Sequence, residues 1–162
     1  GIFRYFNVAG SDPESRSGSI QKPASHLILK ACEAALNISN SIDIFGDDYD
    51  TKDGTCVRDF IHVSDIASAH LDGINYFKKN NTNFISNLGY GEGYSVKEVL
   101  DSVKKISKNN FTINIASRRK GDIDSIVADN NFALNELCWL PKYNNMDLIV
   151  KHQLEWCNKE IK

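Results

Sequence analysis

The most informative chemical feature of this chain is an arginine next to an aromatic residue on one predicted strand. Residues 57–63 read Val-Arg-Asp-Phe-Ile-His-Val. Strand alternation places Arg58, Phe60 and His62 on one face and the intervening residues on the other. A guanidinium on a rigid element can bind phosphate through paired, charge-assisted hydrogen bonds, and the neighbouring ring suits a ring-bearing ligand. A surface ion pair is the alternative role for this arginine.

A second basic segment supports the phosphate interpretation. Arg118, Arg119 and Lys120 follow an apolar strand and precede Gly121 and Asp122. Consecutive cations followed by a carboxylate are suited to phosphate contacts, with an acceptor for sugar hydroxyls alongside. The alternative interpretation is a solvated, charged turn.

Phe45 is a candidate stacking residue. Ile42 and Ile44 share one face of the predicted strand 42–45, so Phe45 lies on the other face beside Asp43. An aromatic ring displaced from the apolar face can stack on a planar ligand such as a nucleobase. The alternative is a strand that is buried on both faces.

The elements that must position these residues alternate between strand and helix. Apolar periodicity and turn residues predict strands at 2–6, 42–45, 57–63, 84–88 and 111–115, and helices at about 23–38, 65–77, 96–106, 130–138 and 146–160. We expect Ser64 or Asp65 to cap the second helix, and Ser95 with Glu98 to form a capping box for the third. This alternation indicates an α/β fold.

The bulk composition excludes some function classes. The chain has 162 residues, is 41% hydrophobic and 25% charged, and carries a net charge of −2. The length suits one domain. The charge argues against a broad surface for nucleic acid or anionic membranes. The four cysteines form no C-x-x-C pair and the histidines have no tight metal spacing, so we expect reduced thiols, no metal site and a cytoplasmic protein.

Taken together, the chain resembles the C-terminal half of the UDP-glucose 4-epimerases, in the extended short-chain dehydrogenase/reductase superfamily. The segments that carry the resemblance are 4–10 (RYFNVAG), 25–28 (SHLI), 44–49 (IFGDDY), 53–63 (DGTCVRDFIHV), 87–89 (NLG), 93–96 (GYSV) and 118–122 (RRKGD). The resemblance implies that residues 1–162 form the UDP-sugar-binding region: a small mixed substrate domain plus two strands, 2–6 and 84–88, of an incomplete Rossmann sheet, without the N-terminal NAD-binding domain.

The resemblance also implies individual roles. Arg58 and Arg119 would bind the pyrophosphate, Phe45 would stack on uracil, and Asp122 would accept from the uridine ribose. The other implied substrate contacts are Asn7, His26, Leu27, Asp43, Val96 and Ile126. Tyr5 and Phe6 would lie near the nicotinamide of NAD.

Three positions depart from the common pattern of that family. Phe60 stands where many relatives carry Tyr, and His26 where many carry Asn. Ile126 falls at the position that sizes the sugar pocket. Its intermediate bulk leaves the tolerance for N-acetylated sugars open.

The family reaction needs parts that these residues do not contain. It interconverts UDP-galactose and UDP-glucose through a 4-keto intermediate, by hydride transfer to a tightly bound NAD. It requires a glycine-rich dinucleotide loop and a Tyr-x-x-x-Lys pair. The Gly89-Gly91-Gly93 segment lacks that spacing, and none of the six tyrosines has Lys four residues later.

We therefore expect this chain to contribute no catalytic residue, to be inactive alone and not to retain NAD. It begins inside an apolar strand without an initiator Met, so we expect a piece of a longer protein. Its parent would be an NAD-dependent homodimer, and a separate N-terminal piece could supply the missing half.

Three alternatives remain open. A related nucleotide-sugar enzyme, such as a uronate epimerase or a 4,6-dehydratase, would share the fold. A non-catalytic UDP-sugar-binding module or gene remnant would share the cleft. A single-stranded nucleic-acid binder is the least favoured, because the aromatic residues are not interleaved with a basic stripe.

Overall fold

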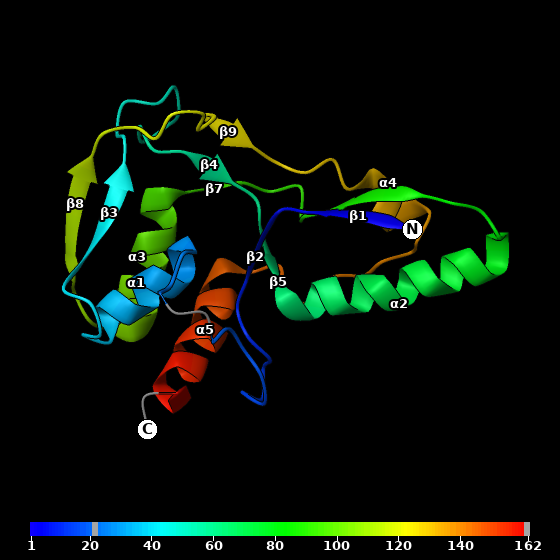
Figure 1. Ribbon diagram of the computed structural model, residues 1–162, viewed down its shortest axis with the longest axis horizontal. Coiled ribbons are helices and arrows are strands. Elements are labelled where there is room, and N and C mark those ends of the chain that lie inside the picture. Colours follow the sequence, from blue (N-terminus) through cyan, green and yellow to red (C-terminus); the bar gives the residue numbers. More distant parts are fainter. Residues whose placement is uncertain (21–22, 161–162) are drawn as a thin grey trace.

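The chain has two hydrophobic cores, one on each side of the central strand pair formed by residues 7–9 and 60–62 (Figure 1). The computed structural model describes residues 1–20 and 23–160 and confirms the α/β class. In chain order the elements are β1 (Ile2–Tyr5), β2 (Asn7–Ala9), α1 (Leu27–Ala35), β3 (Ser41–Phe45), β4 (Val57–Arg58), β5 (Phe60–His62), α2 (Val63–Asn80), β6 (Ile85–Leu88), β7 (Tyr94–Ser95), α3 (Val96–Ser107), β8 (Thr112–Ala116), β9 (Ser125–Ile126), α4 (Asn131–Asn135) and α5 (Met146–Glu160).

The first core packs α1, α3 and α5 against the parallel pair β3–β8. Ile42 and Ile44 point into this core and are almost fully buried, whereas Asp43 is exposed and Phe45 is half-buried. The alternation predicted for this strand is therefore confirmed. It leaves the Phe45 ring outside the core, where it can meet other groups.

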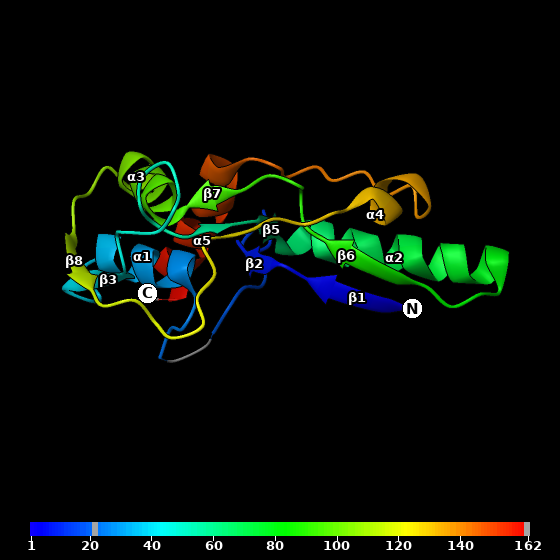
Figure 2. The same ribbon diagram turned by 90° about the horizontal axis from the view of Figure 1, so that it is seen from above.

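The second core lies beneath α2 and the parallel pair β1–β6 (Figure 2). Trp139 is its largest fully buried side chain, and its indole Nε1 donates to the backbone oxygen of Asp65 at 3.0 Å. Among the described residues, β1 has a strand partner on one edge alone. Ile2 and Ile85 on this pair are 59% and 50% exposed. The pair therefore presents exposed apolar side chains.

Strand β5 connects the two cores. Phe60 packs into the first core and Ile61 into the second, as strand alternation requires. The prediction of one continuous strand over 57–63 is wrong, because the chain changes partners at Asp59. Residues before it join a three-stranded sheet between β7 and β9, and residues after it pair with β2.

Predicted helix boundaries are also wrong at α1, at α4 and at α2, which runs from Val63 to Asn80 instead of 65–77. Helix α1 begins at Leu27 instead of Pro23, after an extended His26, and it ends before Asn37, whose φ of 58° is incompatible with a continuing helix. Helix α4 ends at Asn135 instead of residue 138, where Cys138 also has a positive φ.

Helix α2 is capped by His62 instead of Ser64 or Asp65. The Nδ1 atom of His62 accepts from the Ser64 backbone N–H at 3.0 Å, so α2 starts at Val63. The capping box predicted for α3 is confirmed, with Ser95 and Glu98 each satisfying the backbone of the other.

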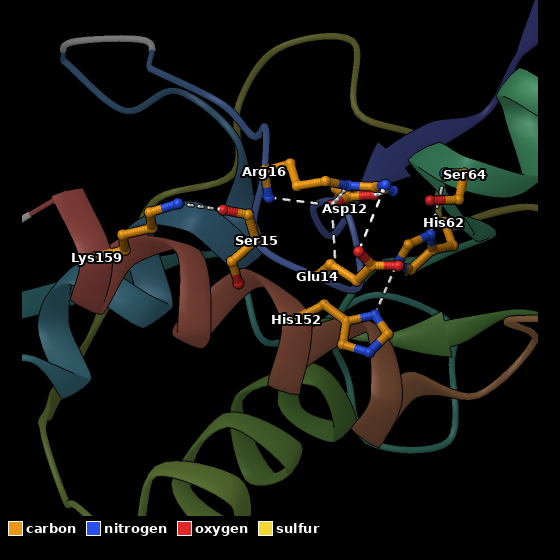
Figure 3. A network of polar contacts seen from close by, with 8 residues as sticks. All are labelled: Asp12, Glu14, Ser15, Arg16, His62, Ser64, His152 and Lys159. Atoms are coloured by element: carbon orange, nitrogen blue, oxygen red, sulfur yellow. Dashed lines mark hydrogen bonds and ion pairs between the residues drawn. The ribbon is translucent and has the colours of Figure 1, made fainter.

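A network of polar contacts links the loop of residues 12–16 and the start of α2 to helix α5 (Figure 3). The Asp12 carboxylate accepts from Arg16, and Lys159 donates to the Ser15 carbonyl at 2.7 Å. His62 Nε2 lies 3.0 Å from His152 Nδ1 in the protein interior. Because His62 Nδ1 accepts from a backbone N–H, Nε2 must be the protonated nitrogen and must donate to His152.

Candidate ligand-binding cavity

A cavity of about 1160 Å³ lies beside the first core and is lined by nearly all the predicted site residues. It is bounded by β2, the start of α1, strand β3 and the segment that carries Arg58. The predicted residues that line it are Tyr5, Phe6, Asn7, His26, Leu27, Asp43, Phe45, Arg58, Val96, Arg119 and Asp122. A volume of this order is sufficient for a ligand larger than a typical drug-sized molecule.

Ile126 is the predicted site residue that does not line this cavity among the described residues. It lies on β9, directly opposite Arg58 in the β4–β9 register, and is 37% exposed. Ile126 is therefore one strand further from the cavity than Arg58. Its role in sizing a sugar pocket stays a prediction.

Arg58 is held rigidly at the cavity wall. Its Nη1 donates to the carbonyl oxygens of Val57 at 2.8 Å and Ile123 at 2.7 Å. Its side chain is 18% exposed, and Nη2 lies 3.8 Å from Asp122 Oδ1. Because one end of the guanidinium is anchored to backbone oxygens, the other end keeps a fixed position from which it can bind an anion.

Asp122 lies between two arginines. Its Oδ2 is 3.4 Å from Arg119 Nε, and its Oδ1 faces Arg58. The guanidinium carbon of Arg119 lies 4.3 Å from the centre of the Phe45 ring, which is within cation–π range. The two predicted phosphate ligands, the stacking residue and the sugar acceptor therefore form one connected group.

Arg118 belongs to a different group, although it precedes Arg119 in sequence. Its Nε lies 2.6 Å from Asp48 Oδ1, and its guanidinium carbon lies 4.0 Å from the centre of the Tyr49 ring. The Arg118 guanidinium lowers the pKa of the Asp48 carboxyl. Among the described residues that line the cavity, Arg118 is absent. The basic segment is thus divided between a turn-stabilising arginine and a cavity arginine.

The buried Asp59 fixes the walls around Arg58, a role that sequence analysis missed. Its carboxylate is fully buried and accepts from the backbone N–H groups of Tyr90 at 2.9 Å, Gly91 at 2.9 Å and Ala128 at 3.2 Å. These bonds join the break between β4 and β5 to two loops that are distant in sequence. The available signal was a charged residue in the middle of an apolar strand, which requires buried partners.

The loop that leads into β4 has a carboxylate at its centre. Asp53 accepts from the backbone N–H and hydroxyl of Thr55, at 2.9 and 2.7 Å, and from the Ser95 hydroxyl. Burial alone would raise the pKa of Asp53, but the hydrogen bonds from Ser95 and Thr55 outweigh burial and lower it. Lys97 also donates to the Asp53 carbonyl at 2.7 Å. These hydrogen bonds hold the loop in one conformation and so fix the position of Arg58 at the cavity wall.

The first turn of α1 faces the cavity. His26 and Leu27 line it, and the N-cap side chain of His26 makes no capping hydrogen bond. The first N–H groups of a helix have no intrahelical acceptor and favour anions. Lys30 and Glu33 of the same helix also line the cavity. Sequence analysis missed both, although their spacing after His26 follows helical periodicity.

Tyr5 also lines the cavity, and its hydroxyl forms a hydrogen bond with His70. The Oη atom is 2.8 Å from His70 Nε2, and His70 Nδ1 is 2.8 Å from the Ile66 carbonyl oxygen. A carbonyl can only accept, so Nδ1 carries the proton and Tyr5 donates to Nε2. The lone pairs of the Tyr5 oxygen stay available to accept a hydrogen bond.

The residues of this cavity can bind and orient a ligand. Across residues 1–20 and 23–160, no three His, Cys, Asp or Glu residues gather as metal ligands. In the same described part of the chain, no helix is long and apolar enough to cross a membrane. All four cysteines are free thiols; Cys138 is exposed, and the others are buried.

Comparison with known proteins shows the family of this chain. Residues 1–89 match the model of the NAD dependent epimerase/dehydratase family. A UDP-glucose 4-epimerase from Rhizobium meliloti is 46% identical over 143 residues, which cover 88% of this chain and 44% of that protein. A UDP-glucose 4-epimerase from Azospirillum brasilense is 43% identical over 155 residues, which cover 96% of this chain and 44% of that protein. The chain thus spans somewhat less than half the length of these relatives.

Solved structures give the same match. The UDP-glucose 4-epimerase from Stenotrophomonas maltophila, with bound NAD and formylated UDP-arabinopyranose, superposes with a TM-score of 0.94 at 32% identity, over 98% of this chain and 47% of that one. Residues 1–89 are more than half of the 162 in this chain. The two curated relatives compared above are UDP-glucose 4-epimerases, and the chain belongs to the NAD dependent epimerase/dehydratase family.

Proposed function

We propose that residues 1–162 form the UDP-sugar-binding part of a UDP-glucose 4-epimerase, which interconverts UDP-glucose and UDP-galactose. One observation carries the proposal. Arg58, Arg119, Phe45 and Asp122 meet in one cavity at contact distances, although they come from three separate segments of the chain. The names of the relatives, which are UDP-glucose 4-epimerases, support the same ligand.

The cavity suggests how a uridine diphosphate would lie. The pyrophosphate would bind between Arg58, Arg119 and the first turn of α1, all of which line the cavity, because arginines and helix N-termini favour anions. Uracil would stack on Phe45 beside Asp43, and the ribose hydroxyls would donate to Asp122.

The sugar would extend from the pyrophosphate toward β2. Asn7, Val96, Tyr5 and Phe6 all line the cavity. An amide side chain such as that of Asn7 can both donate to and accept from sugar hydroxyls. We propose that Ile126 would contact the sugar once the remaining half of the enzyme closes the cavity.

We propose that the glycine-rich loop after β6 does not hold the dinucleotide pyrophosphate of NAD. The Gly89–Gly93 loop follows β6 and resembles a phosphate cradle in composition, but the N–H groups of Tyr90 and Gly91 already donate to the Asp59 carboxylate. A phosphate would have to displace a buried carboxylate to use them. NAD accepts and returns the hydride in this chemistry, so we propose that this chain alone is inactive and that another half of the enzyme holds NAD.

The exposed edge of β1 is the proposed attachment point for that half. We propose that β1 and β6 belong to a larger, parallel NAD-binding sheet. Their parallel pairing and the exposed apolar side chains of Ile2 and Ile85 support this. A separate polypeptide or a preceding segment could supply the remaining strands.

Calorimetric titration of the purified chain with UDP tests the ligand assignment. Arg58→Ala should weaken UDP binding by about 1.5–3 kcal/mol, since it removes a charge-assisted contact, and this is about 10- to 150-fold in affinity. Arg118→Ala is the matched control, because its guanidinium pairs with Asp48 outside the cavity lining. Equal affinities for the wild type and Arg58→Ala would remove Arg58 from the site. An absence of UDP binding by the folded wild-type chain would refute the proposal.

A turnover assay tests whether this chain is inactive without the half of the enzyme that holds NAD. The purified chain, supplied with NAD and UDP-galactose, should give no UDP-glucose above a blank prepared from cells that lack epimerase. Turnover that co-purifies with the chain would contradict the claim that a second half is required.

A further inference from the structure

The Arg119 guanidinium lies over the Phe45 ring, on which the base is proposed to stack. Its guanidinium carbon is 4.3 Å from the Phe45 ring centre, and its Nε is 3.4 Å from Asp122 Oδ2. All three side chains line the same cavity. The Arg119 side chain is nevertheless 65% exposed, so no close packing prevents it from moving.

These contacts compete with those proposed for the bound ligand. A base cannot stack on the face of Phe45 that a guanidinium already covers. Asp122 cannot give both oxygens to Arg119 and Arg58 and also accept from ribose hydroxyls at full strength. Three residues therefore have one set of partners in this structure and another set in the proposed complex.

The resting contacts of Arg119 are weak enough to exchange. The ion pairs of Asp122, at 3.4 and 3.8 Å, are longer than direct charge-assisted hydrogen bonds of about 2.7–2.9 Å. Arg118 gives the contrast within the same turn, since its Nε lies 2.6 Å from Asp48. A pyrophosphate offers Arg119 more charge and better geometry than Asp122 does.

We propose that Phe45 and Asp122 hold Arg119 in a resting position that competes with ligand binding, and that a nucleoside diphosphate releases it. The phosphates then take Arg119 from Asp122, the exposed face of Phe45 accepts the base, and the freed carboxylate accepts the ribose. This inference rests on the proposed function for the identity of the base. The competition itself needs only the phosphates.

The competition predicts different effects of one substitution on two ligands. Pyrophosphate has no base, so Phe45→Leu removes the resting stack and nothing that pyrophosphate uses. An exposed cation–π contact of this kind corresponds to a gain of about two- to fivefold in pyrophosphate affinity. UDP gains the same release of Arg119 but loses its stacking surface, so Phe45→Leu should weaken UDP binding relative to pyrophosphate binding by about fivefold or more.

Asp122→Asn weakens the second resting contact of Arg119, its ion pair with Asp122, and leaves the Phe45 ring in place. It should also tighten pyrophosphate binding. The matched control is Asp124→Asn, which removes the same charge two residues away; Asp124 is absent from the described residues that line the cavity. It should change pyrophosphate affinity less than Asp122→Asn does.

The test is calorimetric titration of the full 162-residue chain and these variants with sodium pyrophosphate and with UDP, after thermal unfolding has confirmed that each variant folds. Tighter pyrophosphate binding in Phe45→Leu, with UDP binding weakened relative to it, would support the resting contact. Unchanged or weaker pyrophosphate binding in Phe45→Leu, or no pyrophosphate binding by the wild type, would overturn it. Tighter pyrophosphate binding in a chain that does not bind UDP would keep the resting contact and refute the uridine assignment.

Discussion

Replacement of the buried Asp59 by Asn is the most direct test of how the cavity walls are held. The substitution changes one oxygen into an amide nitrogen and barely changes the shape of the side chain. Asp59 Oδ1 accepts from the N–H of Tyr90, and Oδ2 accepts from the N–H groups of Gly91 and Ala128. An amide nitrogen cannot accept a hydrogen bond, so at least one of these N–H groups must lose its partner.

The hydrogen bonds of Asp59 determine how much free energy of unfolding Asp59→Asn should lose. In the best orientation, the one oxygen left in the Asp59→Asn side chain keeps the two bonds of Oδ2, and the bond to Tyr90 is lost. A bond to a charged acceptor contributes about 1.5–3 kcal/mol and a neutral one about 0.5–1.5 kcal/mol, so one lost and two weakened bonds sum to about 3–5 kcal/mol. The smaller desolvation cost of a neutral amide offsets part of this. We therefore expect a loss of about 3 kcal/mol, a large share of the roughly 5–15 kcal/mol typical of a domain.

Urea unfolding followed by the fluorescence of Trp139 and Trp156 measures this loss. With a slope of about 2 kcal/mol/M, the midpoint of Asp59→Asn should fall by about 1.5 M. Asp101→Asn, on the exposed face of α3, is the control for loss of one negative charge. If Asp59→Asn unfolds within about 0.3 M of that control, the three backbone bonds do not hold the walls as we infer.

Three further outcomes follow from other parts of the structure. Burial, with His152 nearby, lowers the pKa of His62 to about 4. The unfolded state therefore takes up a proton first, and stability present above about pH 6.5 should be lost between about pH 6.5 and 4, by up to about 3 kcal/mol; an unchanged urea midpoint between about pH 7.5 and 5 would contradict this. Ser95→Ala removes the N-cap of α3 and a donor to Asp53, so thermal unfolding should show a loss of about 1–2 kcal/mol; a change as small as that of an exposed Ser→Ala control would count against the cap. A Cβ at Gly54 (φ 80°) would lie 2.0 Å from the Asp47 carbonyl oxygen, whereas one at Gly121 (φ 94°) would meet nothing within 4 Å; the Ala variants should therefore differ, with a loss of about 1–2 kcal/mol for Gly121→Ala and a clearly greater loss for Gly54→Ala, and equal losses would contradict the steric argument.

Local patterns predicted the element types well. Strand alternation in 42–45 separated the buried isoleucines from Phe45, and the capping box at Ser95 and Glu98 marked the start of α3. Boundaries failed where a distant partner decided them. The His62 side chain starts α2 two residues earlier than the polar residues Ser64 and Asp65 suggest, since it is fixed by His152 from helix α5.

By itself, the sequence determined the α/β class, the residue types that can bind a diphosphate and the family they resemble, because these depend on local periodicity and on side-chain chemistry. The tertiary structure decided which of those residues meet. Arg119 lies on Phe45 and beside Asp122, whereas the neighbouring Arg118 pairs with Asp48 outside the cavity. Adjacent arginines look alike in a sequence, but a turn points them toward different partners. Their roles therefore depend on long-range packing that no local pattern encodes.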